Sequence, residues 1–203
     1  IKQIISNTII IINKNVNKIK REVERMVDVI LVDENDNPIG TAEKLEAHKN
    51  GGKLHRALSI FIFNDKDNLY IQRRALTKYH SAGKWANTCC SHPMPNENIL
   101  DAAHRRLKEE MGFDCNMEEV FNFPYKAYVG NGLTEYEFDH IIFGRFNGVP
   151  KPAPEEVMDW RLVSLDDVKK EIDANKDNFA AWFVLMIDDV SKHFKEWNKN
   201  KKR

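Results

Sequence analysis

The sequence predicts one α+β or α/β domain, because short strand-like runs stand on both sides of one clear amphipathic helix and a helical region closes the chain. With 203 residues, the chain can bury a substantial core within a single domain. We expect a weakly ordered leader over residues 1–24, one domain over 25–198 and a basic tail over 199–203.

The composition indicates a soluble globular protein without a general attraction to nucleic acid or membranes. Apolar residues make up 42% of the chain, charged residues 31%, and the formal net charge is zero. No apolar run approaches the roughly 20 residues of a membrane span. The odd set of Cys89, Cys90 and Cys115 argues against a disulfide framework. We therefore expect a cytoplasmic monomer, with a peroxisomal or organellar address left open because residue 1 is not Met.

The first third of the chain reads as strands separated by turns. The β-branched run 27–32 predicts a strand, and 33–40 (DENDNPIG) has the composition of a turn. Residues 41–48 predict a short helical or irregular segment. Two apolar runs follow, 58–63 and 69–72, joined by a hairpin-like loop. A basic and aromatic loop over 73–80 then leads to a cysteine–histidine stretch.

The clearest helix lies in the middle of the chain. Asn96 or Asn98 can cap its first turn, and Gly112 stands where a helix commonly ends. Its apolar positions recur at three- and four-residue steps: Leu100, Ala103, Leu107 and Met111.

The second half of the chain predicts further strands and then helices. The strand-like runs are 120–129, 138–146 and 160–163. Ser164 to Asp167 resembles a capping box and opens one helix. A last amphipathic helix is expected from about residue 180 to 197.

Several side chains suited to chemistry stand in informative patterns. Cys90 and His92 are two residues apart, so an extended segment would place both on one face. Glu135 and Glu137 would share a strand face in the same way, and His48 and His55 flank a glycine pair. Mixed imidazole and carboxylate donors suit a zinc, manganese or magnesium ion. Each of these residues also has an ordinary structural interpretation as a buried thiol or a surface side chain.

The end of the central helix resembles the Nudix box, Gly-x5-Glu-x7-Arg-Glu-apolar-x-Glu-Glu-x-Gly-apolar. Glu97 occupies the first Glu position, and Arg105 to Phe113 follows the second half of the pattern. Two positions depart from it: Ser91 replaces Gly, and Arg106 replaces a Glu. Nudix hydrolases use these carboxylates to hold divalent ions, so Arg106 argues against an intact hydrolase site.

Taken together, these motifs resemble type 1 isopentenyl-diphosphate isomerase, from about residue 27 to 186. The matching features are Cys90-Ser91-His92-Pro93, Glu135-Tyr136-Glu137, His48, His55, the Arg74/Lys78 loop and the altered Nudix box. The resemblance implies a Nudix fold of the α/β/α sandwich type, with a mixed sheet flanked by helices and an added C-terminal helix. It also implies interconversion of isopentenyl and dimethylallyl diphosphate; from the zero net charge we expect no nucleic-acid or membrane partner.

The resemblance further assigns roles to individual residues. Cys90, Glu137, Tyr125 and Trp182 match the catalytic residues, Trp182 as the indole that stabilises a carbocation. The metal ligands are matched by His48, His55, His92, Glu135 and Glu137. Glu110 matches the ligand of a Mg²⁺ ion that bridges the diphosphate. The contacts of the diphosphate are matched by Lys44, Arg74, Lys78, Ser91 and Arg106.

Three alternatives stay open at this point. A Nudix-type diphosphate hydrolase would need the helix carboxylate that Arg106 replaces. A cysteine hydrolase would need an oxyanion site that the sequence does not offer. A non-catalytic binding module with a Nudix fold would not need the combined Cys90, His92, Glu135 and Glu137 pattern.

Overall fold

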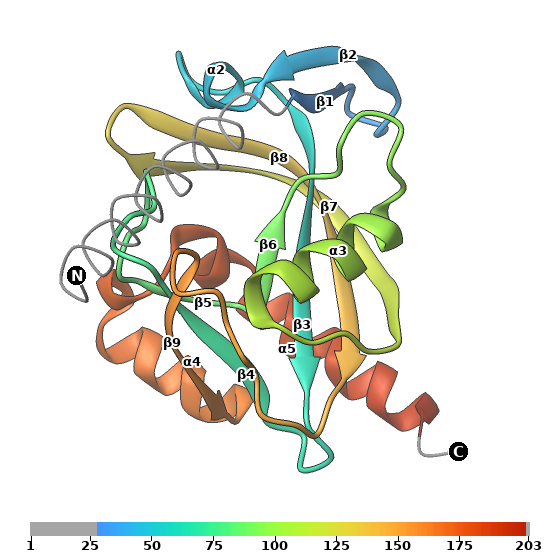
Figure 1. The fold of residues 1–203 in the computed structure, drawn as a ribbon, viewed down its shortest axis with the longest axis vertical. Helices are drawn as coiled ribbons and strands as arrows, with labels where there is room; N and C mark the ends of the chain where they lie inside the picture. The colour runs from blue at the N-terminus through green and yellow to red at the C-terminus, as the bar shows by residue number, and fades with distance from the viewer. Residues whose placement is uncertain (1–27, 202–203) are drawn as a thin grey trace, which may run out of the picture.

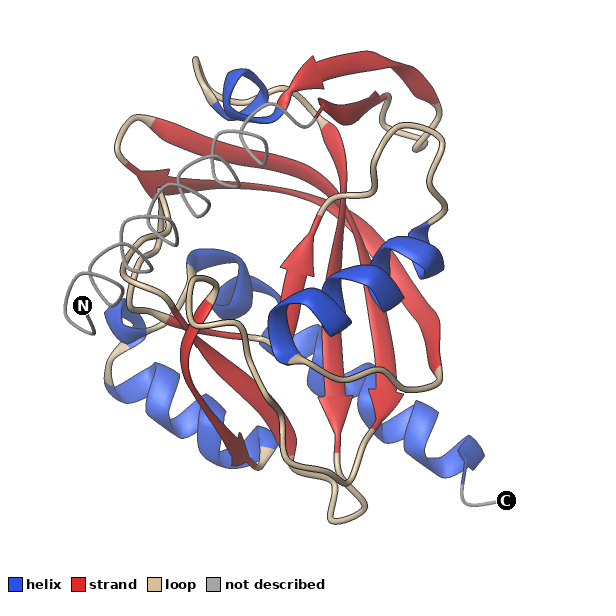
Figure 2. Ribbon diagram, viewed as in Figure 1, coloured by secondary structure: helices blue, strands red, loops and turns tan. Residues whose placement is uncertain are grey.

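The computed structural model describes residues 28–201, so the expected leader over 1–24 lies outside the described residues. A mixed sheet with helices on both faces forms its centre (Figures 1 and 2), which confirms the predicted α+β class. The strands are β1 (Asp28–Val32), β2 (Pro38–Glu43), β3 (His55–Phe63), β4 (Leu69–Arg74), β5 (Trp85–Ala86), β6 (Cys89–Ser91), β7 (Met117–Gly130), β8 (Leu133–Arg145) and β9 (Val157–Val163). The helices are α2 (Lys44–His48), α3 (Ile99–Met111), α4 (Leu165–Ala174), the 3-10 helix η1 (Lys176–Asn178) and α5 (Ala181–Lys201).

The sheet is built around β3. Strand β8 runs parallel to it and places Glu137 opposite His55. Strands β1, β4 and β6 pair with β3 in the antiparallel sense, and Cys90 on β6 lies opposite Ser59. The outer strands are β2 on β1, β7 on β8, and β5 and β9 on β4. This register gathers Cys90 and Glu137, which are distant in sequence, beside the first half of β3.

Alternation along β3 divides the core into two layers. Leu58, Ile60 and Ile62 belong to the cluster that packs against α3. Phe61 and Phe63 belong to the cluster formed with α4 and α5. Because both faces of β3 are buried, its sequence is a continuous apolar run rather than an alternating one.

The central helix forms as predicted, with one difference on its buried face. Asn98 is the cap that the structure uses, because its side-chain oxygen accepts a hydrogen bond from the backbone N–H of Asp101 at 2.8 Å. Gly112 ends the helix with a left-handed φ of 72°. Leu100 was predicted on the apolar face but is 37% exposed, because it lies at the edge of that face in the first turn. Glu110 is buried there instead.

The turn predicted over 33–40 is shorter in the structure, and the expectation for 41–48 was only partly right. The side chain of Asp33 accepts hydrogen bonds from the backbone N–H groups of Asn35 and Asn37, which closes the turn within five residues. Residues 38–43 then form β2, while the expected short helix is confined to α2. β2 was missed because it is an exposed edge strand without an apolar pattern, and an edge strand tolerates Pro38 as its first residue.

The second half of the chain has the predicted elements with longer strands. The hairpin β7–β8 turns at Asn131 and Gly132, whose φ values of 54° and 72° match a two-residue hairpin loop. Ser164 caps α4 by accepting a hydrogen bond from the N–H of Asp167, as the capping box predicts. Helix α5 continues through Lys201, into the stretch expected as a tail.

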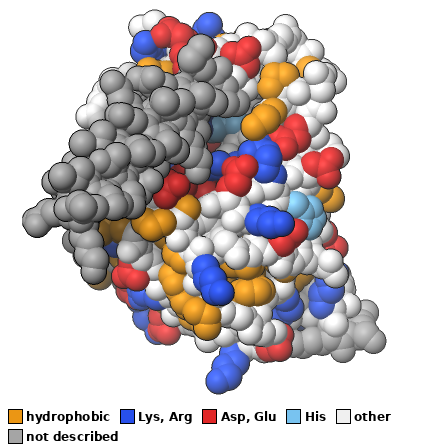
Figure 3. Space-filling model, in the orientation of Figure 1, with side chains coloured by type: hydrophobic (Ala, Val, Ile, Leu, Met, Phe, Trp, Pro, Cys, Tyr) orange, Lys and Arg blue, Asp and Glu red, His pale blue; other side chains and the backbone are white. Residues whose placement is uncertain are grey.

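The surface agrees with the balanced composition. On the part of the face in Figure 3 that the described residues form, acidic and basic side chains are interspersed rather than segregated. None of the described helices combines the length and the apolarity that crossing a membrane requires.

Candidate active site

A cavity opens beside the first half of β3 and is lined from many elements. All of the predicted site residues line it except His48 and His55, which are buried and lie close to the lining residue Glu137. The cavity is lined by Lys44, Arg74, Lys78, Cys90, Ser91, His92, Arg106, Glu110, Tyr125, Glu135, Glu137 and Trp182. Three further residues line it that the sequence analysis did not select: Ser59, Tyr79 and His80.

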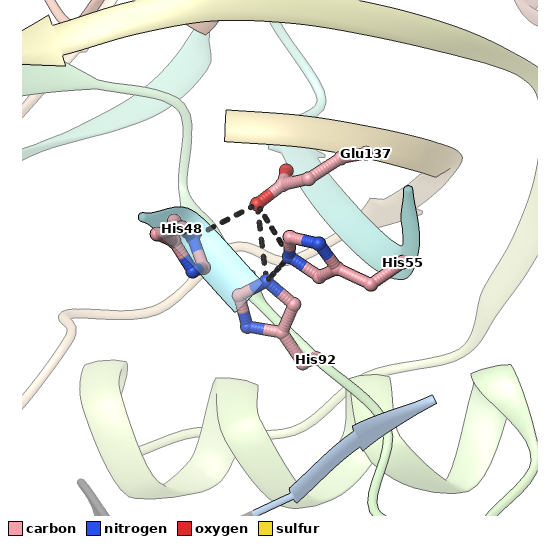
Figure 4. A group of neighbouring side chains, drawn as sticks. All are labelled: His48, His55, His92 and Glu137. Atoms are coloured by element: carbon pink, nitrogen blue, oxygen red, sulfur yellow. Dashed lines mark hydrogen bonds and ion pairs between the residues drawn. The ribbon is translucent and has the colours of Figure 1, made fainter. Parts of the chain in front are cut away.

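Three imidazoles converge on the carboxylate of Glu137, which lines this cavity (Figure 4). Oε1 of Glu137 lies 3.0 Å from Nε2 of His92, 3.5 Å from Nε2 of His55 and 3.7 Å from Nε2 of His48. Nε2 of His55 also lies 3.1 Å from Nε2 of His92. The ligand atoms of the four residues all fall within 4.8 Å of one another.

The donor set fits a divalent metal ion. The Nδ1 atoms of His48 and His55 donate hydrogen bonds to the backbone carbonyls of Lys44 and Lys53, each at 2.7 Å. Because Nδ1 carries the proton in each ring, Nε2 carries a lone pair that can bind a metal ion, and it faces the cluster. Nε2 of His48 is buried and has no hydrogen-bond partner, a costly arrangement that a bound cation would relieve.

Glu135 is grouped differently from the prediction. Its ligand oxygen falls in a second cluster with His48 and His80, rather than within the group around Glu137. The hydroxyl of Tyr125 joins the two carboxylates, since it lies 3.0 Å from Oε2 of Glu135 and 2.6 Å from Oε2 of Glu137. Glu135 and Glu137 therefore share one face of β8, as predicted, but approach different histidines.

The surroundings shift the pKa values of Glu135 and Glu137 in opposite directions. Burial and the charge of Glu137 raise the pKa of Glu135 well above its ordinary value. Burial acts in the same direction on Glu137, but contacts from His48, His55 and His92 outweigh it and hold the pKa of Glu137 well below its ordinary value. Burial and the nearby carboxylates raise the pKa of Tyr125, which therefore keeps its proton.

Cys90 occupies the wall formed by β6. Its sulfur lies 3.9 Å from Nη1 of Arg74. Burial raises the pKa of the Cys90 thiol to about 12, although the charge of Arg74 acts in the opposite direction. The cavity therefore combines a protonated thiol from β6 with an ionised carboxylate from β8.

Trp182 contributes a buried aromatic face from the first turn of α5. Its indole Nε1 donates a hydrogen bond of 3.0 Å to Oδ1 of Asn87, which fixes the orientation of the ring. The guanidinium carbon of Arg74 lies 5.1 Å from the centre of the indole, and His80 contacts the ring in a T-shaped arrangement at 5.8 Å. The face of this ring can stabilise positive charge in the cavity.

Cations gather at another part of the cavity wall. Burial, together with the charges of Lys78 and Arg106, lowers the pKa of Lys44 to about 8. Nη2 of Arg106 contacts Oε1 of Glu110 at 2.5 Å and Oε1 of Glu156 at 3.7 Å, and Lys78 forms an ion pair with Glu156. Clustered cations of this kind can bind a multivalent anion.

Glu110 is the ionised carboxylate among these cations. Burial alone would raise its pKa, but Arg106, Lys78 and a 3.1 Å hydrogen bond from Gln72 lower it to about 2. Glu97, the first acidic residue of the Nudix-like pattern, is instead paired with Arg105, whose Nε and Nη2 each lie 2.7 Å from its carboxylate oxygens. Of these two helix-associated carboxylates, only Glu110 lines the cavity.

Sequence reasoning missed several residues that line the cavity or contact its lining. His80 does not stand in a group of candidate ligands in the sequence, so no pattern there marks it. Asn87 and Glu156 carry no local signal, because their partners Trp182 and Lys78 are distant in the chain. Only the packing of β9 and α5 against the sheet brings these pairs together.

Comparisons with known proteins agree with this architecture. Residues 53–183 match the family model described as the NUDIX domain. A solved structure from Deinococcus radiodurans shares the fold with a TM-score of 0.66 at 15% identity, covering 79% of this chain and 97% of that one. The MutT protein from Methanosarcina mazei gives a TM-score of 0.54 at 16% identity, covering 74% of this chain and 96% of that one. At these identities the structures support the fold alone.

Relatives of higher identity define the family more narrowly. Isopentenyl-diphosphate Delta-isomerase 2 of Aromatoleum aromaticum is 49% identical over 162 residues, covering 80% of this chain and 85% of the relative. The isopentenyl-diphosphate Delta-isomerase of Pectobacterium atrosepticum is 43% identical over 178 residues, covering 88% of this chain and 99% of the relative. The chain therefore belongs to the NUDIX family and, within it, to the isopentenyl-diphosphate Delta-isomerases.

Proposed function

We propose that this chain interconverts isopentenyl diphosphate and dimethylallyl diphosphate, small prenyl diphosphates that differ in the position of one double bond. The observation that carries this proposal is the pairing of Cys90 with the Glu137–Tyr125 pair in one cavity. The family relationship at 43% to 50% identity supports the same reaction.

The reaction needs one proton added and another removed. Addition of a proton to the terminal alkene carbon gives a tertiary carbocation, and loss of a proton from the carbon two positions away forms the new double bond. Cys90 and Tyr125 carry protons that can be given, while the ionised Glu137 can receive one. The proton count balances because the product has the same composition as the substrate.

Trp182 is the group suited to protect the carbocation. The indole face stands against the cavity and is 1% exposed, so it can stabilise positive charge without adding a nucleophile. Exclusion of water from the site prevents hydration of the cation.

The cationic wall is the part suited to the diphosphate. Lys44, Arg74, Lys78 and Arg106 supply positive charge, and Ser91 supplies a hydroxyl beside Cys90. Anchoring the diphosphate there leaves the five-carbon chain to extend toward Cys90 and Glu137. Arg106 would thus bind the group that a hydrolase cleaves.

Two divalent ions fit the proposal. The donors His48, His55, His92, Glu137 and, nearby, Glu135 suit Zn²⁺, Mn²⁺ or Mg²⁺, with nitrogen donors favouring the transition metals. The carboxylate of Glu110 suits a Mg²⁺ ion that also contacts the diphosphate. When bound, a cation at the histidine cluster offsets the cost of gathering buried carboxylates and makes Glu137 a weaker base.

Two substitutions test the assignment of the proton-transfer groups. Cys90→Ala and Glu137→Gln should each reduce kcat for isopentenyl diphosphate by at least about a hundredfold, because each removes a proton-transfer group. Cys115→Ala, which changes a cysteine outside the cavity, should leave kcat unchanged. Near-full activity of either site variant, with metal content and folding intact, would remove that residue from the mechanism.

The alternatives predict other products. A diphosphate hydrolase would release inorganic phosphate or pyrophosphate, and a binding module would bind prenyl diphosphate without changing it. We also expect a monomer located in the cytoplasm, and both remain predictions.

A further inference from the structure

The loop between β4 and β5 brings a histidine to the metal site from a separate direction. His80 lies on this loop, residues 75–84, and is 7% exposed. Its ligand atom falls with those of His48 and Glu135 in a group whose members all lie within 4.8 Å of one another. This group shares only His48 with the cluster around Glu137.

The spacing of this group suits a metal ion. Nε2 of His80 lies 3.7 Å from Oε1 of Glu135. The ring centres of His48 and His80 are 6.1 Å apart, close to the 5.7 Å that separates His48 from His92. Ligands at about 2.1 Å from an octahedral ion stand about 3 to 4.2 Å from one another, so small movements would bring these atoms onto one ion.

Unsatisfied polarity provides a second observation. Nε2 of His48 is buried and lacks a hydrogen-bond partner, although Nδ1 of the same ring is held by the carbonyl of Lys44. His48 is the residue that both groups of candidate ligands share. A cation placed between them satisfies it and contacts donors on either side.

We propose that His80 is a further ligand of the divalent ion held by this site, so that the ion ties the 75–84 loop to the sheet. This inference deepens the proposed function and rests on its metal site. The loop also carries Lys78, and the carbonyl of His80 accepts a hydrogen bond of 3.3 Å from Nη2 of Arg74. Ion binding would therefore fix two of the cations that face the diphosphate.

Cobalt titration of the metal-free chain tests the ligand role. His80→Phe keeps a ring against Trp182 and His48 but removes both nitrogen donors, and His80→Gln provides a smaller polar replacement. Each should raise the Kd for Co²⁺ on the order of 10- to 100-fold and change the visible absorption spectrum of the bound ion. His104→Phe, which changes a half-exposed histidine paired with Asp114, should alter neither.

Hydrogen–deuterium exchange tests the link to the loop. Added Co²⁺ should slow exchange over 75–84 in the unaltered chain and in His104→Phe, but not in His80→Phe. An unchanged Kd and spectrum in a folded His80→Phe or His80→Gln chain would overturn the proposal, as would failure of the unaltered chain to bind Co²⁺. If neither variant folds, cobalt binding to the unaltered chain without slower exchange over 75–84 overturns it instead.

The isomerase assay is scored separately. A chain that binds Co²⁺ through His80 but does not convert isopentenyl diphosphate would refute the proposed function and leave this inference standing. A chain that converts isopentenyl diphosphate fully but binds Co²⁺ equally well without His80 would support the proposed function and refute this inference.

Discussion

At the scale of single residues, Arg106 separates this site from that of a diphosphate hydrolase. It stands where the Nudix pattern has a carboxylate, and it contacts Glu110 and Glu156 on the cavity wall. A guanidinium there repels a metal ion and attracts a diphosphate. On the proposed function, this one substitution in an otherwise matching helix replaces a metal ligand with a group that binds the diphosphate.

Lys44 gives a pH-dependent prediction at this scale. Burial and the charges of Lys78 and Arg106 lower its pKa to about 8, while Glu137 and Cys90 act in the opposite direction. In the proposed function the protonated amine binds the diphosphate, so kcat/KM should fall as pH rises above about 8, approaching tenfold per pH unit. A pH profile of kcat/KM measures this decline, the alkaline limb of the profile.

Lys44→Arg is the matched control for that profile. A guanidinium remains protonated throughout this range, so the variant should lack the alkaline limb even if its KM differs. An identical fall in the Lys44→Arg chain would assign the limb to another group.

The predicted site residues gather around one cavity, whereas partners that only tertiary structure joins carry no signal in the sequence; the roles of the predicted residues stay predictions. All of them line the cavity except His48 and His55, which lie near Glu137 on its wall. Glu135 was expected among the ligands around Glu137, yet its ligand oxygen is grouped with His48 and His80. Neither this grouping nor the pairing of Asn87 with Trp182 leaves a signal in local sequence.

At the scale of elements, the end of α3 shows how a single glycine fixes the path of the chain toward β9. Gly112 has a left-handed φ of 72°, and a Cβ there would lie 2.1 Å from the carbonyl oxygen of Lys151. That oxygen belongs to the segment whose N–H groups at Lys151 and Ala153 bond to the last carbonyls of the helix. The close approach positions Glu156 beside Arg106.

Gly112→Ala should therefore destabilise the protein by more than about 2 kcal/mol, because it adds a backbone clash to the cost of a left-handed alanine. Gly130→Ala is the matched control, since Gly130 also has a positive φ but has open space around its Cβ position. It should cost only about 1–2 kcal/mol. Urea unfolding of both variants measures the difference, and equal losses would show that the contact with Lys151 does not contribute.

Elements whose own residues form a continuous or periodic apolar pattern were predictable from the sequence, and the exposed edge strand β2 was not. Strand β3 and helix α3 are recognisable because their apolar residues are continuous or periodic. Strand β2 is mostly exposed, and its only strong constraint is its pairing with β1. Its formation depends on a neighbour rather than on its own residues, so local composition suggested a turn.

At the scale of the whole molecule, three distant regions of the chain build one site. Strand β6 supplies Cys90, β8 supplies Glu135 and Glu137, and α5 closes the cavity with Trp182. The same helix packs Phe183, Met186 and Val190 into the core, so folding of the C-terminal region also completes the active site. Stability and activity are therefore expected to be lost together when α5 is disrupted.

Conversion of isopentenyl diphosphate in heavy water tests the central claim, which is that only hydrogens move while the diphosphate stays intact. Mass spectrometry of the product should find dimethylallyl diphosphate carrying deuterium, and no phosphate or pyrophosphate should be released. Product without deuterium, or release of either phosphate species in place of isomerisation, would contradict the account.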